Sequence, residues 1–306
     1  MTAKAETQRI AKVIARSGLC SRRDAEVLIA EGRVSLDGRV LDSPAVTVRP
    51  GQRILVDETP LPAPAPARLW RYHKPAGLLT AARDPEGRPT IFDSLPKDLP
   101  RLQPVGRLDL NSEGLLLLTN DGEMKRELEL PASGWERRYR VRAFGRVSEA
   151  RLESLRDGIT VEGVRYGPIK ARIERASGAN LWLSVILTEG KNREVRRVLA
   201  HLDLKVNRLI RVGFGPFTLG NLARGAVSEV PAKRLREALE GPTKPKAGWA
   251  KAKPKPTRPG RKPLAGPKSG PKPGAKSSGG PKAKPKATPG PGKKEGPRDA
   301  HRRRPA

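Results

Sequence analysis

The sequence predicts an α+β protein with a small module at the front, a larger domain built on a mainly antiparallel mixed sheet, and a disordered basic tail. Two helix patterns precede a few short strand patterns over residues 8–58. Strand and helix patterns then follow one another in irregular order over residues 68–240, without the βαβ repeat of a parallel sheet. Residues 241–306 are dominated by Lys, Pro and Gly, and carry too little apolar surface to offset the entropy of folding.

The charge of the chain is strongly positive and unevenly distributed. The 306 residues have a formal net charge of +30. Residues 241–306 hold 20 of the 62 basic and 2 of the 32 acidic residues, which places +18 on the tail and +12 on the rest. Such a charge is typical of proteins that bind a polyanion, most often nucleic acid. The tail can either attract RNA nonspecifically or serve only to solubilise the chain.

Composition also excludes several classes of protein. The longest aliphatic run, Leu115–Leu118, is far shorter than the roughly 20 apolar residues that a membrane-spanning helix needs. Cys20 is the only cysteine, which excludes a disulfide scaffold, and it shows no metal-ligand spacing with His73, His201 or His301. No glycine-rich nucleotide loop and no apolar leader is present. We therefore expect a cytoplasmic protein, a monomer by default, without metal, nucleotide cofactor or membrane partner.

The front module begins with two short helices. Apolar spacing predicts the first over residues 10–18. The segment SRRD at residues 21–24 has the form of a capping box and predicts the start of the second, which ends before Gly32. The remaining predicted elements are strands over residues 34–36 and 53–56, with a hairpin turn at Asp37-Gly38.

Basic side chains gather on this module. Arg22 and Arg23 lie in the first turn of the second helix, where free N–H groups and the positive end of the dipole favour a phosphate, and Arg33 flanks the first strand. The stretch SGLCSRRDAEVLIAEGRVSLDGRVL, within residues 8–58, resembles an S4 RNA-binding domain of the αL type. The resemblance implies that these arginines face structured RNA. The alternative is an ordinary capped helix with solvated arginines.

Alternating Pro and Ala residues separate the two domains. Residues 59–67 read TPLPAPAPA, which favours a stiff, extended spacer. We therefore place a boundary between an RNA-binding module at 8–58 and a larger domain at 68–240. The elements expected in the larger domain are strands over 69–72, 115–118, 138–144, 181–187 and 208–212, and helices over 120–129, from 148, over 195–202 and over 231–239.

One acidic residue stands at a position suited to catalysis. Asp109 lies in a polar loop beside Arg107, just before the apolar run Leu115–Leu118. A carboxylate held at the mouth of a core strand near a guanidinium stays ionised, and can act as a base or nucleophile. An Asp in a turn-rich loop is more commonly a turn former, so physical reasoning leaves both interpretations open.

Four motifs resemble one enzyme family. GRLDLNSEGLLLLTNDGE around Asp109 resembles the signature of the pseudouridine synthases related to the small-subunit ribosomal enzyme, whose members often carry an S4 domain. TEGKNREVRRVL at residues 188–199, RRYRV at residues 137–141 and HKPAGLLT at residues 73–80 match the same family. The resemblance implies a pseudouridine synthase catalytic domain at 68–240 that needs no cofactor.

The resemblance also implies roles for individual residues. Asp109 is the catalytic nucleophile, Tyr139 stacks on the target base, and Arg196 is the basic partner of Asp109. Without the resemblance Tyr139 would be assigned to the core, and the basic face of the helix over 195–202 to solvent. Arg107 is expected to contact the substrate, and further RNA contacts are expected from three residues: Lys74, Lys191 and Arg193.

Position 194 departs from the family pattern. The motif NREVRR has Glu194 where the family usually has Gln, so the family's substrate contact is not carried over to this position.

The segment RDPEGRPTIFDSLP at residues 83–96 resembles the large-subunit branch of the family. It implies a uridine of 23S rRNA near the peptidyl-transferase region, free or in a large-subunit precursor particle. The alternatives are a 16S rRNA substrate and, from another class, a non-catalytic ribosome-assembly factor.

Overall fold

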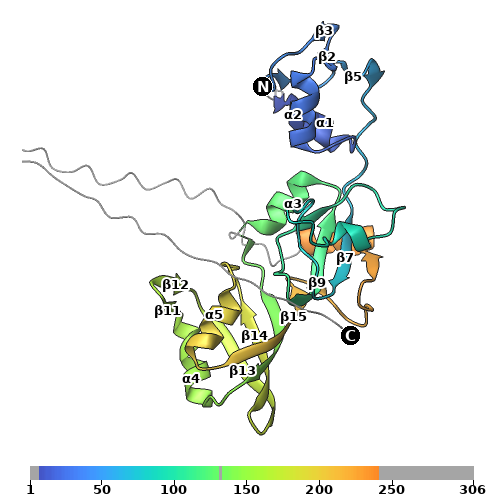
Figure 1. Ribbon diagram of the computed structural model, residues 1–306. Coiled ribbons are helices and arrows are strands. Elements are labelled where there is room, and N and C mark those ends of the chain that lie inside the picture. The colour runs from blue at the N-terminus through green and yellow to red at the C-terminus, as the bar shows by residue number, and fades with distance from the viewer. Residues whose placement is uncertain (1–6, 131–132, 241–306) are drawn as a thin grey trace, which may run out of the picture. The chain divides into compact units, whose positions relative to one another are not determined.

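The computed structural model describes residues 7–130 and 133–240, so the predicted disordered tail lies outside the described residues. The front module packs two helices against short strands around one apolar core (Figure 1). The front sheet has the strand order β3-β2-β5-β6, and β1 pairs with β4. Its elements are β1 (Gln8–Arg9), α1 (Ile10–Arg16), α2 (Arg22–Ala30), β2 (Val34–Leu36), β3 (Arg39–Val40), β4 (Thr47–Val48), β5 (Ile54–Val56) and β6 (Thr59–Pro60).

The predicted start of α2 is confirmed. The Ser21 hydroxyl accepts a hydrogen bond from the Asp24 N–H at 3.0 Å, and the Asp24 carboxylate accepts one from the Ser21 N–H at 3.1 Å. Gly32 follows the helix with φ +69°, as a residue at this position requires. Thr59–Pro60 differs from expectation, because it forms an edge strand of the front sheet rather than part of the spacer.

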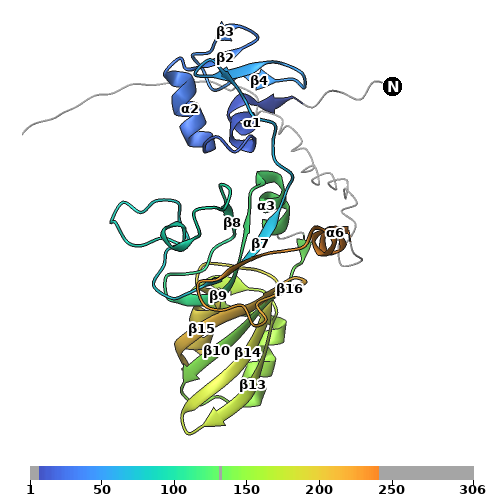
Figure 2. The same ribbon diagram turned by 90° about the vertical axis from the view of Figure 1, so that its right-hand side faces the viewer.

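The larger domain is built on one nine-stranded mixed sheet (Figure 2). The strand order is β13-β14-β10-β15-β9-β7-β17, with β16 beside β15 and β8 beside β9. Every pair is antiparallel except β9 with β15. Its strands are β7 (Leu69–Lys74), β8 (Gln103–Val105), β9 (Ser112–Thr119), β10 (Arg137–Phe144), β13 (Ile169–Ser177), β14 (Asn180–Leu187), β15 (Lys205–Phe214), β16 (Phe217–Thr218) and β17 (Val227–Glu229).

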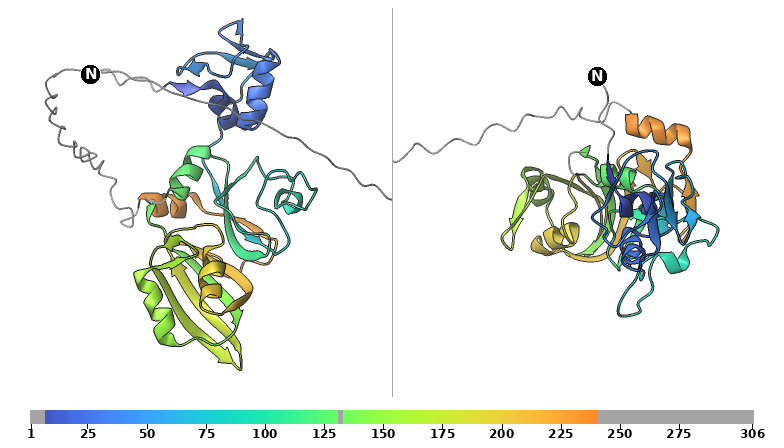
Figure 3. Two further views of the ribbon diagram at one scale, coloured as in Figure 1. Left: turned by 60° about the vertical axis from the view of Figure 1, so that its left-hand side comes forward. Right: turned by 90° about the horizontal axis from the view of Figure 1, so that it is seen from above.

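Helices cover parts of this sheet. The α4 and α5 helices pack on one face of β10, β13 and β14 around one apolar cluster (Figure 3). The α3 and α6 helices share a second cluster with β7, β9 and β15. The remaining elements are α3 (Gly122–Glu129), α4 (Glu149–Glu153), α5 (Glu194–His201), α6 (Ala232–Glu240), the short helices η1 (Phe92–Ser94) and η3 (Ser154–Asp157), and the hairpin of β11 (Ile159–Val161) and β12 (Val164–Tyr166).

The parallel contact between β9 and β15 joins the two halves of the sheet. Ser112, Glu113 and Gly114 pair with residues 209–211. Gly114 has φ +103°, and a Cβ atom there would lie 2.3 Å from the Arg211 carbonyl oxygen. The close approach of the two strands therefore requires glycine. It places the loop before β9 beside the middle of β15.

Candidate active site

Asp109 lies in the loop between β8 and β9, here called the 106–111 loop. The loop leads directly into β9, whose eight residues are all buried. The Asp109 side chain is 23% exposed. The Gly106 N–H donates to the Glu129 carboxylate at 2.7 Å and fixes the start of the loop to α3. The carboxylate is thus presented from a rigid strand end, as the sequence predicts.

Lys74 anchors this loop from inside the protein. Its side chain is fully buried, and Nζ donates to the carbonyl oxygens of Asp109 at 3.2 Å, Leu110 at 3.3 Å and Ser112 at 3.0 Å. A fourth bond goes to the carbonyl of Pro75 at 3.0 Å. Burial lowers the pKa of Lys74 to about 8. The expectation that Lys74 contacts RNA is therefore wrong, since its ammonium group is occupied by main-chain carbonyls and inaccessible to a phosphate.

Two further side chains hold the same loop. The Thr80 hydroxyl donates to the Leu108 carbonyl at 2.9 Å. The Arg196 guanidinium donates to the Asn111 carbonyl at 3.0 Å and to the Val206 carbonyl at 3.2 Å, so it links α5 to the loop and to β15. The loop is therefore fixed through its main chain by residues outside it.

The ion pair of Asp109 comes from Arg193, not from Arg196 as the sequence reasoning expected. Arg193 Nη1 lies 3.8 Å from Asp109 Oδ2. Arg193 precedes α5 and has φ +51°, a left-handed conformation. Burial lowers the pKa of Arg196 and the negative charge of Asp109 opposes that shift, but the two described hydrogen bonds of Arg196 go to carbonyls. The turn before the helix thus directs Arg193, rather than Arg196, to the carboxylate.

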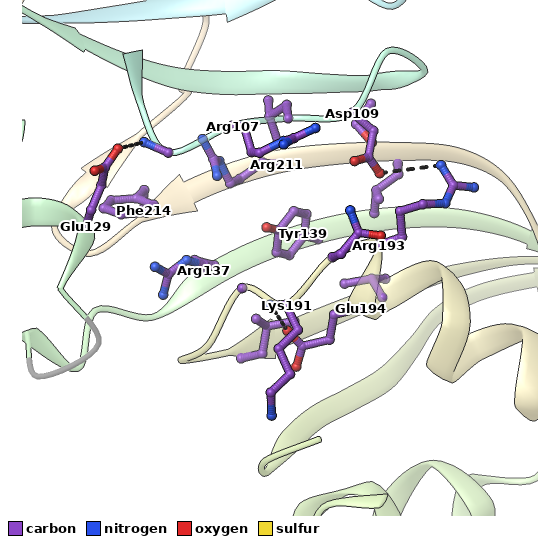
Figure 4. A pocket seen from close by; sticks show the side chains of 18 residues that line it. Arg107, Asp109, Glu129, Arg137, Tyr139, Lys191, Arg193, Glu194, Arg211 and Phe214 are labelled. Carbon is purple, nitrogen blue, oxygen red and sulfur yellow. Dashed lines mark hydrogen bonds and ion pairs between the residues drawn. The ribbon is translucent and has the colours of Figure 1, made fainter. Parts of the chain in front are cut away.

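Asp109 and Tyr139 line one cavity of about 410 Å³. In Figure 4 the Tyr139 side chain lies between the Asp109–Arg193 pair and Arg137. Arg107 is exposed and lines the cavity as well. The other lining residues come from the loop, from α3, from strands β9, β10, β14 and β15, and from the start of α5 with the segment before it: Gly106, Leu108, Ser112, Glu129, Arg137, Leu187, Gly190, Lys191, Asn192, Arg193, Glu194, Val195, Leu209, Arg211 and Phe214.

Sequence reasoning missed two of these arginines. Arg137 and Arg211 lie 4.9 Å and 5.3 Å from the centre of the Phe214 ring. Arg211 is buried, and its Nε donates to the Leu115 carbonyl at 2.8 Å. Arg137 stands in the RRYRV motif two residues before Tyr139, so alternation along the strand places both on the same face. This spacing in the sequence could have identified Arg137 as a neighbour of Tyr139 in the site.

Glu194 contributes a buried carboxyl to the cavity. It is 3% exposed, and its Oε2 accepts the Lys191 N–H at 2.9 Å. Burial raises the pKa of Glu194, and with a smaller contribution from the neighbouring Glu189 carboxylate the pKa reaches about 7. A carboxyl in a cavity whose pKa lies near neutral pH marks this as a functional-site candidate.

The other predicted RNA contacts differ in their surroundings. Arg22 and Arg23 are exposed on the first turn of α2. Arg33 is exposed but forms a two-point hydrogen bond with Asp57, at 2.7 Å for each contact, and that bond raises its pKa. Lys191 lines the cavity, while its Nζ pairs with Glu189 at 2.8 Å. Of the four, Arg22 and Arg23 have the side chains most available to a phosphate.

The arrangement can perform nucleophilic chemistry on a flat polar group. A carboxylate opposite a guanidinium stays ionised and oriented. An aromatic ring beside it offers a stacking surface, and several arginines offer phosphate contacts. Within the described residues no three His, Cys, Asp or Glu side chains form a metal-binding cluster. No helix in the described ranges has the length and apolar character to cross a membrane.

Comparison with known proteins assigns both domains. Residues 8–54 match the model of the S4 domain, and residues 68–201 match that of RNA pseudouridylate synthase. An RNA pseudouridine synthase of Rickettsia felis is 46% identical over 75% of this chain and 100% of its own length. The ribosomal large subunit pseudouridine synthase B of Escherichia coli (strain K12) is 42% identical over 77% of this chain and 84% of its own.

A solved structure supports the same assignment. The crystal structure of a pseudouridylate synthase matches with a TM-score of 0.55 and 26% identity, over 76% of this chain and 99% of that one. The mixed sheet and the front module are thus those of a known enzyme fold. The chain belongs to the RNA pseudouridine synthases that carry an N-terminal S4 domain.

Proposed function

We propose that this protein converts one uridine of 23S rRNA to pseudouridine, with Asp109 as the nucleophile. The supporting observation is the Asp109 carboxylate, which faces Arg193 in a cavity that Tyr139 also lines. The choice of 23S rRNA is supported by the 42% identity to the large-subunit synthase of E. coli. The substrate is the rRNA itself or a large-subunit precursor particle. Since ribosomes are assembled in the cytoplasm, we expect the protein to act there. We take a monomer as its default oligomeric state.

The proposed reaction is an isomerisation whose atoms balance without a co-reactant. The Asp109 carboxylate assists cleavage of the N1–C1′ bond of the uridine, by attack on either the ribose or the base. The uracil then rotates and C5 bonds to C1′, while the bond between Asp109 and the substrate breaks and returns the free carboxylate. The proton that C5 loses is balanced by the one that N1 gains. No electron leaves or enters, so the scheme calls for no redox or nucleotide cofactor.

The RNA must present the uridine outside its helix. Flipping a base out of a stack costs a few kcal/mol, which stacking on an aromatic ring and phosphate contacts recover. We assign stacking to Tyr139 and a substrate contact to Arg107. Arg196, whose guanidinium bonds two main-chain carbonyls, would act by positioning the 106–111 loop. Arg22, Arg23 and Arg33 of the S4 domain would hold structured RNA, and Lys191 and Arg193 the strand near the cavity.

The largest expected effect comes from removing the nucleophile. Asp109→Asn keeps the shape of the side chain and removes its charge, so activity should fall by roughly 10³-fold or more. The measurement is a map of pseudouridines in 23S and 16S transcripts treated with each variant. The matched control is Asp98→Asn, which alters an exposed carboxylate outside the cavity lining and should leave activity unchanged.

The same map separates the alternatives. A site in 23S rRNA that needs Asp109 supports the proposal, and a site in 16S rRNA would replace the substrate. Full activity of Asp109→Asn would contradict the nucleophile. Tight rRNA binding by a wild type that forms no pseudouridine in either RNA would favour a non-catalytic assembly factor.

A further inference from the structure

Arg211 has one guanidinium nitrogen that the protein leaves without a partner. Nε donates to the Leu115 carbonyl at 2.8 Å, whereas Nη2 is buried and has no hydrogen-bond partner among the described residues. The residue is only 3% exposed, yet it lines the cavity that contains Asp109 and Tyr139. A buried charged group with an unused donor is costly. Such a nitrogen at a binding cavity indicates that the bound ligand supplies the acceptor.

The Phe214 end of the cavity has an excess of positive charge. The guanidinium groups of Arg137 and Arg211 lie 4.9 Å and 5.3 Å from the centre of the Phe214 ring. Burial lowers the pKa of Arg137, and the positive charge of Arg211 lowers it further. Three carboxyl groups line the cavity, and each has hydrogen-bond or ion-pair partners other than Arg211: Asp109, Glu129 and Glu194. This end therefore offers hydrogen-bond donors to an acceptor that the described residues do not supply.

The unused donor lies away from the nucleophile. Figure 4 shows Arg211 and Phe214 on one side of the Tyr139 ring and Asp109 on the other. In the proposed reaction Asp109 acts at the glycosidic bond, so N1 of the uracil faces it. A uracil stacked on Tyr139 then directs its opposite edge, which carries the carbonyl oxygen O4, toward Arg211. Because Nη2 is buried, it suits the inner edge of a base better than a backbone phosphate.

We propose that Arg211 donates a hydrogen bond from Nη2 to O4 of the target uracil. This inference rests on the proposed function, because it takes the uracil as the occupant of the cavity. A guanidinium has donors only and stays charged, so it matches a carbonyl oxygen. When the N1–C1′ bond breaks, negative charge spreads over the ring onto its two carbonyl oxygens, and a fixed cation at O4 stabilises that charge. Arg211 keeps its protons throughout, so it adds no step to the isomerisation.

The test changes single atoms on both sides of the contact. Single-turnover rates are measured with a 23S rRNA fragment that carries uridine, 4-thiouridine or 2-thiouridine at the position found by the pseudouridine map. Sulfur accepts hydrogen bonds more weakly than oxygen. The wild type should therefore lose about 10-fold with 4-thiouridine but less than about threefold with 2-thiouridine, whose O4 is intact. This comparison uses the wild type alone, so it does not depend on the folding of a variant.

Arg211→Gln tests the protein side of the contact. It removes Nη2 but keeps an N–H donor at the place of Nε for the Leu115 carbonyl, and urea unfolding checks that it is folded. The variant should lose about 10–100-fold with uridine. It should lose no more than about threefold further with 4-thiouridine, because the contact is already absent. The matched control is Arg172→Gln, an exposed position of β13 outside the cavity lining, which should stay within about twofold of wild type.

Several outcomes would count against the inference. If the losses from Arg211→Gln and 4-thiouridine multiply in full, or if the wild type tolerates both thiouridines equally, Arg211 does not contact O4. RNA affinity at several salt concentrations should be nearly the same for Arg211→Gln and wild type. Weaker binding with a salt dependence reduced by about one contact would assign Arg211 to a phosphate. These results leave the proposed function standing, whereas a wild type that modifies no rRNA overturns both.

Discussion

The two walls of the cavity are held mainly by different kinds of contact. The 106–111 loop is fixed through its main chain: Lys74, Thr80 and Arg196, all outside the loop, donate to its carbonyls or to those just beyond it. The turn before α5 is held mainly by its own ionisable side chains, although Arg137 on β10 also donates to the Thr188 carbonyl. There Glu194 accepts the Lys191 N–H, and Lys191 pairs with Glu189.

Because of this difference, the position of the Asp109 side chain and the ionisation of the turn before α5 depend on different residues. A loop anchored by its carbonyls leaves the Asp109 side chain free to react, and the position of that side chain depends on distant residues. A turn anchored by carboxylates and a lysine changes its interactions when those groups titrate. Mutations outside the loop should therefore affect the position of Asp109. A change of pH between about 4.5 and 7 should affect the turn and not the loop, because Lys74 stays protonated below its pKa of about 8.

The largest stability effect should come from Lys74→Met. Its four carbonyl acceptors would lose their buried donor, which should cost about 3–5 kcal/mol in the free energy of unfolding. Urea unfolding measures the cost. Lys97→Met, at an exposed position, is the control and should stay within about 0.5 kcal/mol of wild type. If Lys74→Met changes the free energy of unfolding as little as Lys97→Met does, the loop does not depend on the hydrogen bonds from Lys74 to its carbonyls.

Gly114→Ala tests the strand that carries the loop. The new Cβ would lie 2.3 Å from the Arg211 carbonyl oxygen, and the backbone has φ +103°, so we expect a loss of about 2–4 kcal/mol. Gly178→Ala is the matched control, because Gly178 has φ +59° but no atom within 4 Å of the added Cβ. It should lose only about 1 kcal/mol, the cost of the left-handed conformation. Equal losses in urea unfolding would show that crowding against β15 is not important.

Much of the sheet and the position of the nucleophile could be predicted from the sequence. The capped helix α2 and the apolar strand β9 follow from local patterns, and Asp109 follows from a long motif. The strand β13 was not predicted, although Ile169, Ala171 and Ile173 face the core and alternate with charged residues as in a half-buried strand.

The anchoring of the site could not be predicted. The partners of Lys74 are main-chain carbonyls, which carry no side-chain signal in the sequence. The choice of Arg193 over Arg196 depends on one left-handed residue before α5. A motif therefore identifies the residues of the site, whereas the backbone decides their contacts.

Glu194 makes the turn sensitive to pH. Its pKa is raised from 4.5 in the unfolded chain to about 7 in the folded protein, so the folded state binds more protons between these values. The free energy of unfolding should accordingly fall as the pH rises from about 4.5 to about 7, by about 1–3 kcal/mol in total from this group. Glu194→Gln should remove that component when urea unfolding is repeated across the interval. An unchanged slope would mean that Glu194 is ionised in the folded protein.

The smallest effects should distinguish the two arginines that face the loop. Arg196 is partly buried and bonds two carbonyls, so Arg196→Met should cost about 1–2 kcal/mol of stability. Arg193 is 52% exposed and pairs with Asp109 at 3.8 Å, so Arg193→Met should cost under about 1 kcal/mol. Higher salt should weaken the contribution of Arg193 and leave that of Arg196 nearly unchanged, because only the exposed pair is screened. Urea unfolding of both variants at two salt concentrations measures the two stability costs and their dependence on salt. If Arg193→Met costs more stability than Arg196→Met, the ion pair from the turn holds the 106–111 loop. The contrast between the two walls would then be wrong.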